Sequence, residues 1–176
     1  MRAHCEGVAE ATRNVGGSCD HARASPLAER SGKMIAMLIK DCTGLTSAKA
    51  VWDFTTGDAR RFHDRASLML HAAKRFTEQG IQPDFVVLLH GAATKFAAAS
   101  FAGTKFVGDD AANLAEIQST LKELTLVGGR IEVCEIAMQR SDVARTNIVP
   151  FMEIEENVFV NSIALQNRGY AYIPIG

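Results

Sequence analysis

The sequence has few aromatic side chains and no excess of positive charge. Its 176 residues include one Trp and two Tyr, and the formal net charge is −1. Proteins that bind nucleic acids usually carry a basic excess that neutralises phosphates, and those that bind single strands stack the bases on aromatic rings. We therefore expect no nucleic-acid partner.

The sequence also lacks a long apolar run. A transmembrane helix needs ~20 consecutive apolar residues, and no stretch of this chain approaches that length. The run 34–39 has six apolar residues between Lys33 and Lys40, and the apolar core of a signal peptide has roughly 7 to 15. We expect a cytoplasmic protein with no membrane partner, and a degenerate leader is the alternative.

Dense, evenly spaced cysteines are absent as well. Of the four cysteines, Cys5, Cys19 and Cys42 precede residue 45, and Cys134 is far from them. Small secreted proteins held by disulfides show a denser pattern, so we expect free thiols in a reducing compartment. The sequence contains no phosphate loop, dinucleotide fingerprint or zinc-ligand spacing. We therefore expect no cofactor and no metal.

Two segments of the chain differ in their patterning. Residues 1–33 mix Gly, Ser, Arg, Ala and His without a sustained strand or helix period, which is typical of a disordered or atypical extension. Regular apolar periods begin near residue 49 and continue to residue 176. A hydrophobic content of 47% over the chain is enough for one domain with its own core.

Strand and helix patterns alternate along residues 49–176. The strand patterns are short β-rich or continuous apolar runs, and the helix patterns repeat apolar residues every three or four positions. The expected elements are a strand at 50–55, a helix at 62–76, a strand at 84–91, a helix at 114–124, a strand at 130–134, a helical turn at 136–141, a strand at 151–154, a helix at 157–168 and a strand at 170–174. This order predicts an α/β fold, a single-domain parallel sheet of about five strands with helices on both faces, as in flavodoxin.

Residues 92–110 fit neither pattern. The segment is rich in Ala, Phe, Gly and Lys. Phe96, Phe101 and Phe106 are difficult to bury in one small domain, and exposed apolar patches usually mark interfaces. We therefore expect this segment to form a surface for oligomerisation or for a small ligand.

The candidate site residues follow from the expected sheet. In open parallel sheets the functional crevice lies at the carboxyl ends of the strands. The chain positions at those ends are Thr55, Thr56, His90, Gly91 and Cys134. We expect these residues to lie along one edge of the sheet.

Cys134 closes a strand and precedes a helical turn. The thiolate is the reactive form of cysteine, and backbone N–H groups at a helix start favour it. Arg140 would add to this effect and Glu135 would oppose it. Free cysteine is also among the most buried residue types, so the residues alone favour a structural cysteine slightly over a reactive one.

The other candidates also have structural alternatives. His90 is a candidate proton shuttle or general base, although a hydrogen bond to a loop carbonyl is favoured over either role. Thr55 and Thr56 are candidates for binding a substrate through their hydroxyls, and capping of their turn is favoured for both. We interpret the three glutamates between 153 and 156 as the acidic N-terminus of the next helix rather than as acid–base groups or metal ligands.

Three segments of the chain resemble the DsrE/DsrF-like family. They are the apolar strand 85–91, the segment 131–138 in which a strand ends in Cys134, and the Gly-Tyr-Ala-Tyr-Ile sequence at 169–173. The resemblance covers about residues 49–175. It implies a parallel DsrE-like α/β fold that assembles into trimers or hexamers. In sulfur-relay members a cysteine at the matching strand end carries a persulfide, which would make Cys134 the sulfur carrier.

The resemblance leads to two hypotheses about function. In the first, Cys134 carries or transfers persulfide sulfur between partner proteins of intracellular sulfur metabolism, His90 shuttles a proton, and Gly91, Arg140 and the threonine pair contact the substrate. In the second, the chain is a non-catalytic oligomeric or small-ligand-binding module of the same fold. A flavin-binding protein ranks third, because the turn 55–58 is too short and too weakly polar for a phosphate loop.

Overall fold

The computed structural model describes residues 42–110 and 112–176. Gly44–Gly176 form one compact unit, which contains the expected domain at 49–176. The extension predicted at 1–33 lies outside the described residues. Within 42–110 and 112–176, none of the helices is both long and apolar enough to cross a membrane.

The centre of the unit is a parallel sheet of five strands in the order β4-β3-β2-β1-β5. The strands are β1 (Ser47–Phe54), β2 (Gln82–Leu89), β3 (Gly129–Cys134), β4 (Glu153–Glu155) and β5 (Ala171–Ile175). The long apolar strand β2 occupies the middle and is buried along most of its length. The prediction of a parallel α/β sheet is confirmed.

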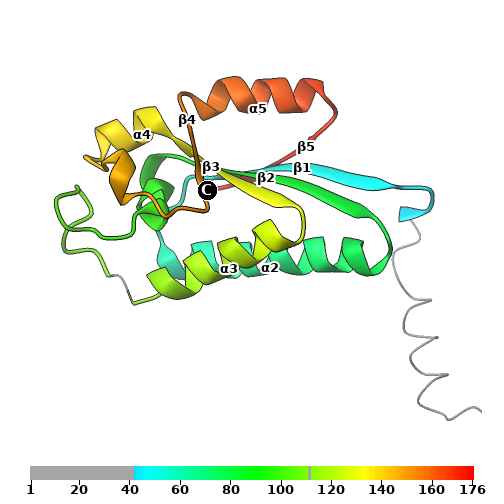
Figure 1. The fold of residues 1–176 in the computed structure, drawn as a ribbon, viewed down its shortest axis with the longest axis horizontal. Helices are drawn as coiled ribbons and strands as arrows, with labels where there is room; N and C mark the ends of the chain where they lie inside the picture. Colours follow the sequence, from blue (N-terminus) through cyan, green and yellow to red (C-terminus); the bar gives the residue numbers. More distant parts are fainter. Residues whose placement is uncertain (1–41, 111) are drawn as a thin grey trace, which may run out of the picture. The chain divides into compact units, whose positions relative to one another are not determined.

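Helices cover both faces of this sheet (Figure 1). Between the strands lie α2 (Ala59–Glu78), the 3₁₀ helix η2 (Gly91–Ala97), α3 (Leu114–Leu126), α4 (Glu135–Arg140), the 3₁₀ turn η3 (Arg145–Asn147) and α5 (Val158–Asn167). Helices α2 and α3 pack side by side on one face, whereas α4 and α5 lie on the other (Figure 1).

Alternation along β2 divides the core between the two faces. Phe85, Val87 and Leu89 belong to the larger cluster under α2 and α3. Val86 and Leu88 point to the opposite face, where they pack in a smaller cluster with residues of α4 and α5. Cys134 belongs to this smaller cluster, so its side chain lies on the α4 and α5 side of the sheet.

The expectation that the phenylalanines of residues 92–110 resist burial is wrong. Phe96 is 1% exposed and Phe101 is 9% exposed, and Phe106 packs partly buried against the same core. The reason is that η2 packs against α3 and the sheet and directs Phe96 at α2, where its ring lies 4.3 Å from the Phe62 ring, centroid to centroid. Phe62 in turn lies 4.5 Å from Phe54, so the rings bury one another.

The interpretation of the acidic residues near 153–156 also needs correction. Glu153 and Glu155 belong to the edge strand β4 rather than to a helix start. The residue that caps α5 is Asn157, whose side-chain oxygen accepts a hydrogen bond from the backbone N–H of Phe159 at 3.1 Å. The amide of Asn157 performs the capping role that the charges were expected to perform.

Candidate functional site

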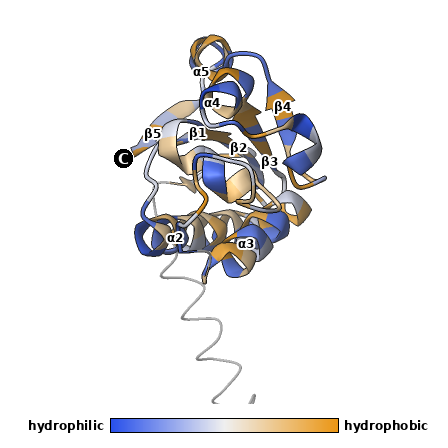
Figure 2. Cartoon of the chain, turned by 90° about the vertical axis from the view of Figure 1, so that its left-hand side faces the viewer, coloured by the Kyte–Doolittle hydropathy of each residue, from blue (hydrophilic) through white to orange (hydrophobic). Residues whose placement is uncertain are grey.

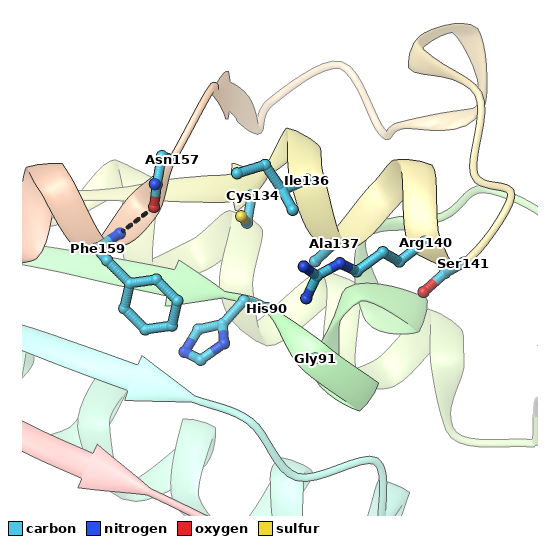
Figure 3. Close-up of a pocket in the computed structure, with 9 residues that line it drawn as sticks. All are labelled: His90, Gly91, Cys134, Ile136, Ala137, Arg140, Ser141, Asn157 and Phe159. Carbon is cyan, nitrogen blue, oxygen red and sulfur yellow. Dashed lines mark hydrogen bonds between the residues drawn. The ribbon is translucent and has the colours of Figure 1, made fainter.

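A cavity of about 390 Å³ opens at the carboxyl edge of the sheet, above the ends of β2 and β3. Its size falls in the range of roughly 300–1,000 Å³ that is common for small-molecule sites. Figure 3 shows the residues that line it, which are His90, Gly91, Cys134, Ile136, Ala137, Arg140, Ser141, Asn157 and Phe159. Four of the sequence candidates, His90, Gly91, Cys134 and Arg140, therefore share one cavity.

Cys134 is the last residue of β3 and the N-cap residue of α4. Its backbone is extended, with φ −70° and ψ 117°, so the chain turns directly from strand to helix at this position. The residue is 3% exposed, and it lines the cavity where Figure 3 shows its sulfur. Its thiol is therefore shielded from bulk water and reached through the cavity.

His90 is held by a carboxylate from the neighbouring strand. Its Nε2 lies 2.7 Å from Oδ1 of Asp53 in β1, and its ring packs edge-on against Phe159 with centroids 4.9 Å apart (Figure 3). An ionised carboxylate only accepts hydrogen bonds, so Nε2 carries the hydrogen in this pair. Within the described residues Nδ1 makes no hydrogen bond, which leaves it as the ring nitrogen free for proton transfer.

Asp53 joins His90 to Tyr172 of β5, whose hydroxyl donates to the other carboxylate oxygen. Burial alone raises the pKa of Asp53, but hydrogen bonds from His90 and Tyr172, together with the charge of His90, outweigh burial and hold that pKa below its ordinary value of 3.8. The hydrogen bond to Asp53, supported by burial and by the charge of Asp53, raises the pKa of Tyr172 to about 12. Asp53 is therefore ionised at neutral pH.

Arg140 is the positive charge of the cavity. It is the last residue of α4, and Figure 3 shows its guanidinium extended along the cavity beside Ala137. Across residues 42–110 and 112–176, this guanidinium makes no hydrogen bond and no ion pair. The nearby Glu135 is already paired with Arg145.

Thr55 and Thr56 lie outside the group of residues that line the cavity. The hydroxyl of Thr55 donates to the carbonyl oxygen of Ile175 at 3.4 Å. The hydroxyl oxygen of Thr56 accepts from the backbone N–H of Asp58 at 3.2 Å. The Thr56 contact lies within its own turn, as the capping alternative expects. The Thr55 contact instead joins the end of β1 to the end of β5, 120 positions away.

A second cluster of ionisable groups lies on the outer side of β3. Glu132 is 1% exposed, and its oxygens accept from Arg130 Nε at 2.9 Å and from Asn161 Nδ2. One carboxylate oxygen of each of Glu132, Glu153 and Glu155 lies within 4.8 Å of the others. Burial raises the pKa of Glu132 despite these hydrogen bonds. Since Glu132 is already satisfied by Arg130 and Asn161, we interpret the cluster as a polar link between β3, β4 and α5.

Sequence reasoning missed several residues of the site. Asp53 offered a signal, because a carboxylate within a buried strand requires a partner. Asn157 offered another, since Asn directly before an apolar helix is a typical cap. Phe159 and Tyr172 offered none, because their positions depend on how α5 and β5 pack onto the sheet.

Comparison with known proteins places the chain in a family. A sequence model of the DsrE/DsrF-like family matches residues 49–175. An uncharacterized protein of Aquifex aeolicus (strain VF5) is 32% identical over 127 residues, which make up 72% of this chain and 55% of that protein. The chain thus spans about half the length of this curated relative.

Solved structures share the fold at low sequence identity. MTH1491, a protein of unknown function from Methanobacterium thermoautotrophicum, is 15% identical with a TM-score of 0.54, and the match covers 72% of this chain and 98% of that one. The ychN protein of E. coli is 8% identical with a TM-score of 0.50, over 72% of this chain and 98% of that one. The family match and these folds agree with the parallel α/β sheet described above. The chain belongs to the DsrE/DsrF-like family.

Proposed function

We propose that the protein carries and transfers sulfane sulfur as a persulfide on Cys134. The observation that supports this most directly is the position of Cys134 on the carboxyl edge of the sheet, where it lines the same cavity as the cationic side chain of Arg140. A purely structural cysteine needs no cavity beside it. The expected partners are a sulfur donor and an acceptor protein.

The proposed transfer is two thiol exchanges without net oxidation. The Cys134 thiolate attacks the outer sulfur of a donor R–S–SH, the S–S bond of the donor breaks, and the donor leaves as R–S⁻. The product Cys134–S–SH then gives its outer sulfur to an acceptor thiolate in the same manner, which returns Cys134 as a thiolate. The rate of each step depends on the thiolate fraction and on access to the sulfur.

His90 is proposed to move the proton in these steps through Nδ1. The pair with Asp53 fixes the ring and keeps a hydrogen on Nε2. The structure contains no hydrogen bond between the His90 ring and the Cys134 sulfur within the described residues. Proton transfer would therefore pass through the donor molecule or a water in the cavity rather than directly between the two side chains.

Incubating the full chain with a small persulfide donor tests the proposal. We expect one added sulfur atom, located on Cys134 by site-resolved mass spectrometry, and loss of that adduct in Cys134→Ser. The matched control is Cys42→Ser, which removes a half-buried thiol and should leave loading of Cys134 unchanged. An unmodified Cys134, or an adduct that persists in Cys134→Ser, would contradict the proposal.

A homo-oligomer is proposed as the working form, with α5 at the contact between copies. Phe159, Val160 and Ile163 are 55%, 65% and 61% exposed on this helix, and Figure 2 shows the hydrophobic colour of α5 at the outside of the sheet. Because Phe159 also lines the cavity, a neighbouring copy would lie at the rim of the Cys134 site.

Charge placed on this helix is expected to prevent assembly. Ile163→Glu puts a carboxylate in the middle of the exposed α5 face, where its burial against a second copy would be unfavourable. We expect light scattering to show a multimer for the unmodified chain and a monomer for Ile163→Glu. Leu126→Glu is the control, because Leu126 is 78% exposed on α3, across the sheet. A wild-type chain that is monomeric at micromolar concentration would refute the assembly.

A further inference from the structure

The charged groups that line the Cys134 cavity are of one sign, positive. No carboxylate is among its lining residues. Asp53 pairs with His90 and Glu135 pairs with Arg145, whereas Glu155, opposite Cys134 in β4, and Glu156 line a neighbouring pocket instead. Among the lining residues Arg140 carries the positive charge, and its guanidinium has no partner within the described part of the chain. A guanidinium left unpaired beside a cavity is a group that an anion satisfies.

Two neutral side chains in the lining, Asn157 and Ser141, can also donate hydrogen bonds to an anion. The side-chain oxygen of Asn157 accepts from the Phe159 N–H, so its amide N–H groups are the part left to bind a ligand. Ser141, next to Arg140, also lines the cavity, and its hydroxyl makes no hydrogen bond within the described residues. The lining thus offers hydrogen-bond donors and a cation, while Ile136 and Phe159 supply an apolar wall.

We infer that Arg140 is a specificity-determining residue that selects a low-molecular-weight sulfur donor bearing a negative charge close to the transferred sulfur. This inference rests on the sulfur transfer proposed above and adds the class of donor. The anionic group, a sulfonate or a carboxylate, pairs with Arg140 while the sulfane sulfur faces Cys134. With a donor such as thiosulfate, the Cys134 thiolate attacks the sulfane sulfur, the S–S bond breaks, and sulfite leaves with the bonding electrons.

Alkylation with a matched pair of reagents measures the charge of the site without any sulfur donor. Iodoacetate and iodoacetamide have the same reacting carbon and leaving group and differ in charge. We expect Arg140→Gln to lower the ratio of the iodoacetate rate to the iodoacetamide rate at Cys134 by roughly five-fold, which is the scale of one partly screened charge. Arg140→Lys should retain most of the preference.

The controls separate a local effect from a change in total charge. Arg60→Gln removes an exposed charge at the start of α2, across the sheet from Cys134, and should leave the ratio unchanged. Cys42, followed in the same digest, should show the same ratio in every variant. The inference is overturned if Arg140→Gln and the wild-type chain give equal ratios at Cys134.

Sulfur loading then tests the donor class. The probes are the persulfide of N-acetylcysteine, which carries a carboxylate, the persulfide of its neutral amide, and thiosulfate. We expect Cys134 to load faster from the anionic persulfide than from the amide, and this preference to disappear in Arg140→Gln. Loading by thiosulfate would favour a sulfonate donor over a carboxylate donor. Equal loading from both persulfides overturns the inference and leaves sulfur transfer intact, whereas no loading from any probe overturns sulfur transfer itself.

Discussion

Gly128→Ala is expected to lower the free energy of unfolding by about 3 kcal/mol or more. Gly128 has φ +99°, a conformation that costs a residue with a side chain roughly 1–2 kcal/mol. A Cβ at this position would also lie 2.5 Å from the carbonyl oxygen of Pro83 and 2.9 Å from Nε2 of Gln82. Pro83 belongs to β2, which is paired on both sides, so the backbone cannot move away without disturbing the sheet.

Gly80→Ala is the matched control for this substitution. Gly80 follows α2 as Gly128 follows α3, and it has φ +73° with nothing within 4 Å of the point where a Cβ would lie. Only the conformational cost remains there, about 1 kcal/mol. Urea denaturation followed by circular dichroism measures both values. Equal destabilisation of the two variants would show that the contact with Pro83 is relieved at little cost.

The order of helices and strands was predictable from the sequence because it depends on local patterns. The apolar run of β2 and the regular spacing of α2 are properties of short segments, and each occurs where its pattern predicts. Residues 92–110 were different. The burial of Phe96 depends on Phe62, which is far away in the sequence, and no local pattern encodes that contact.

Some residues of the candidate site could likewise be predicted from local patterns, and others depend on long-range strand pairing. Cys134 and His90 could be placed at one edge because parallel strands end together, and both line the cavity. The bond between Tyr172 and Asp53 joins residues 119 positions apart and requires β5 to pair with β1. No local sequence pattern predicts that pairing, because β5, the last strand of the chain, lies beside β1, the first. The position of His90 could therefore be predicted from the sequence, whereas its contact with the Asp53–Tyr172 pair could not.

Asp53→Ala is expected to cost about 2 kcal/mol of unfolding free energy, because the part-buried Nε2–H of His90 and the hydroxyl of Tyr172 lose their shared acceptor. Asp53→Asn keeps the shape and should cost about 1 kcal/mol.

The folded state lowers the pKa of Asp53, so the unfolded chain binds the proton more tightly and stability rises with pH in that range. The contribution of Asp53 is complete above its ordinary pKa of 3.8 and is lost as the pH falls toward the folded value.

The difference in stability between the wild-type chain and Asp53→Asn should accordingly be constant near neutral pH and shrink below about pH 4. Urea denaturation at a series of pH values measures it. Asp64→Asn is the control, because the Asp64 side chain is 62% exposed and its removal should change stability little at any pH. If the stability difference between the wild-type chain and Asp53→Asn does not change below about pH 4, the charge of the Asp53 carboxylate contributes nothing to stability.

The same pair of residues gives a spectroscopic test at the alkaline end. The hydrogen bond to ionised Asp53 is the main reason that the pKa of Tyr172 rises to about 12. In a Tyr170→Phe background, where Tyr172 is the remaining tyrosine of the chain, phenolate absorbance follows its titration alone. Asp53→Asn should move this pKa toward its ordinary value of 10.0, because the amide carries no charge to oppose the phenolate. A Tyr172 titration that does not change would show that Asp53 and Tyr172 are not coupled, so that Tyr172 does not help to hold Asp53 against His90.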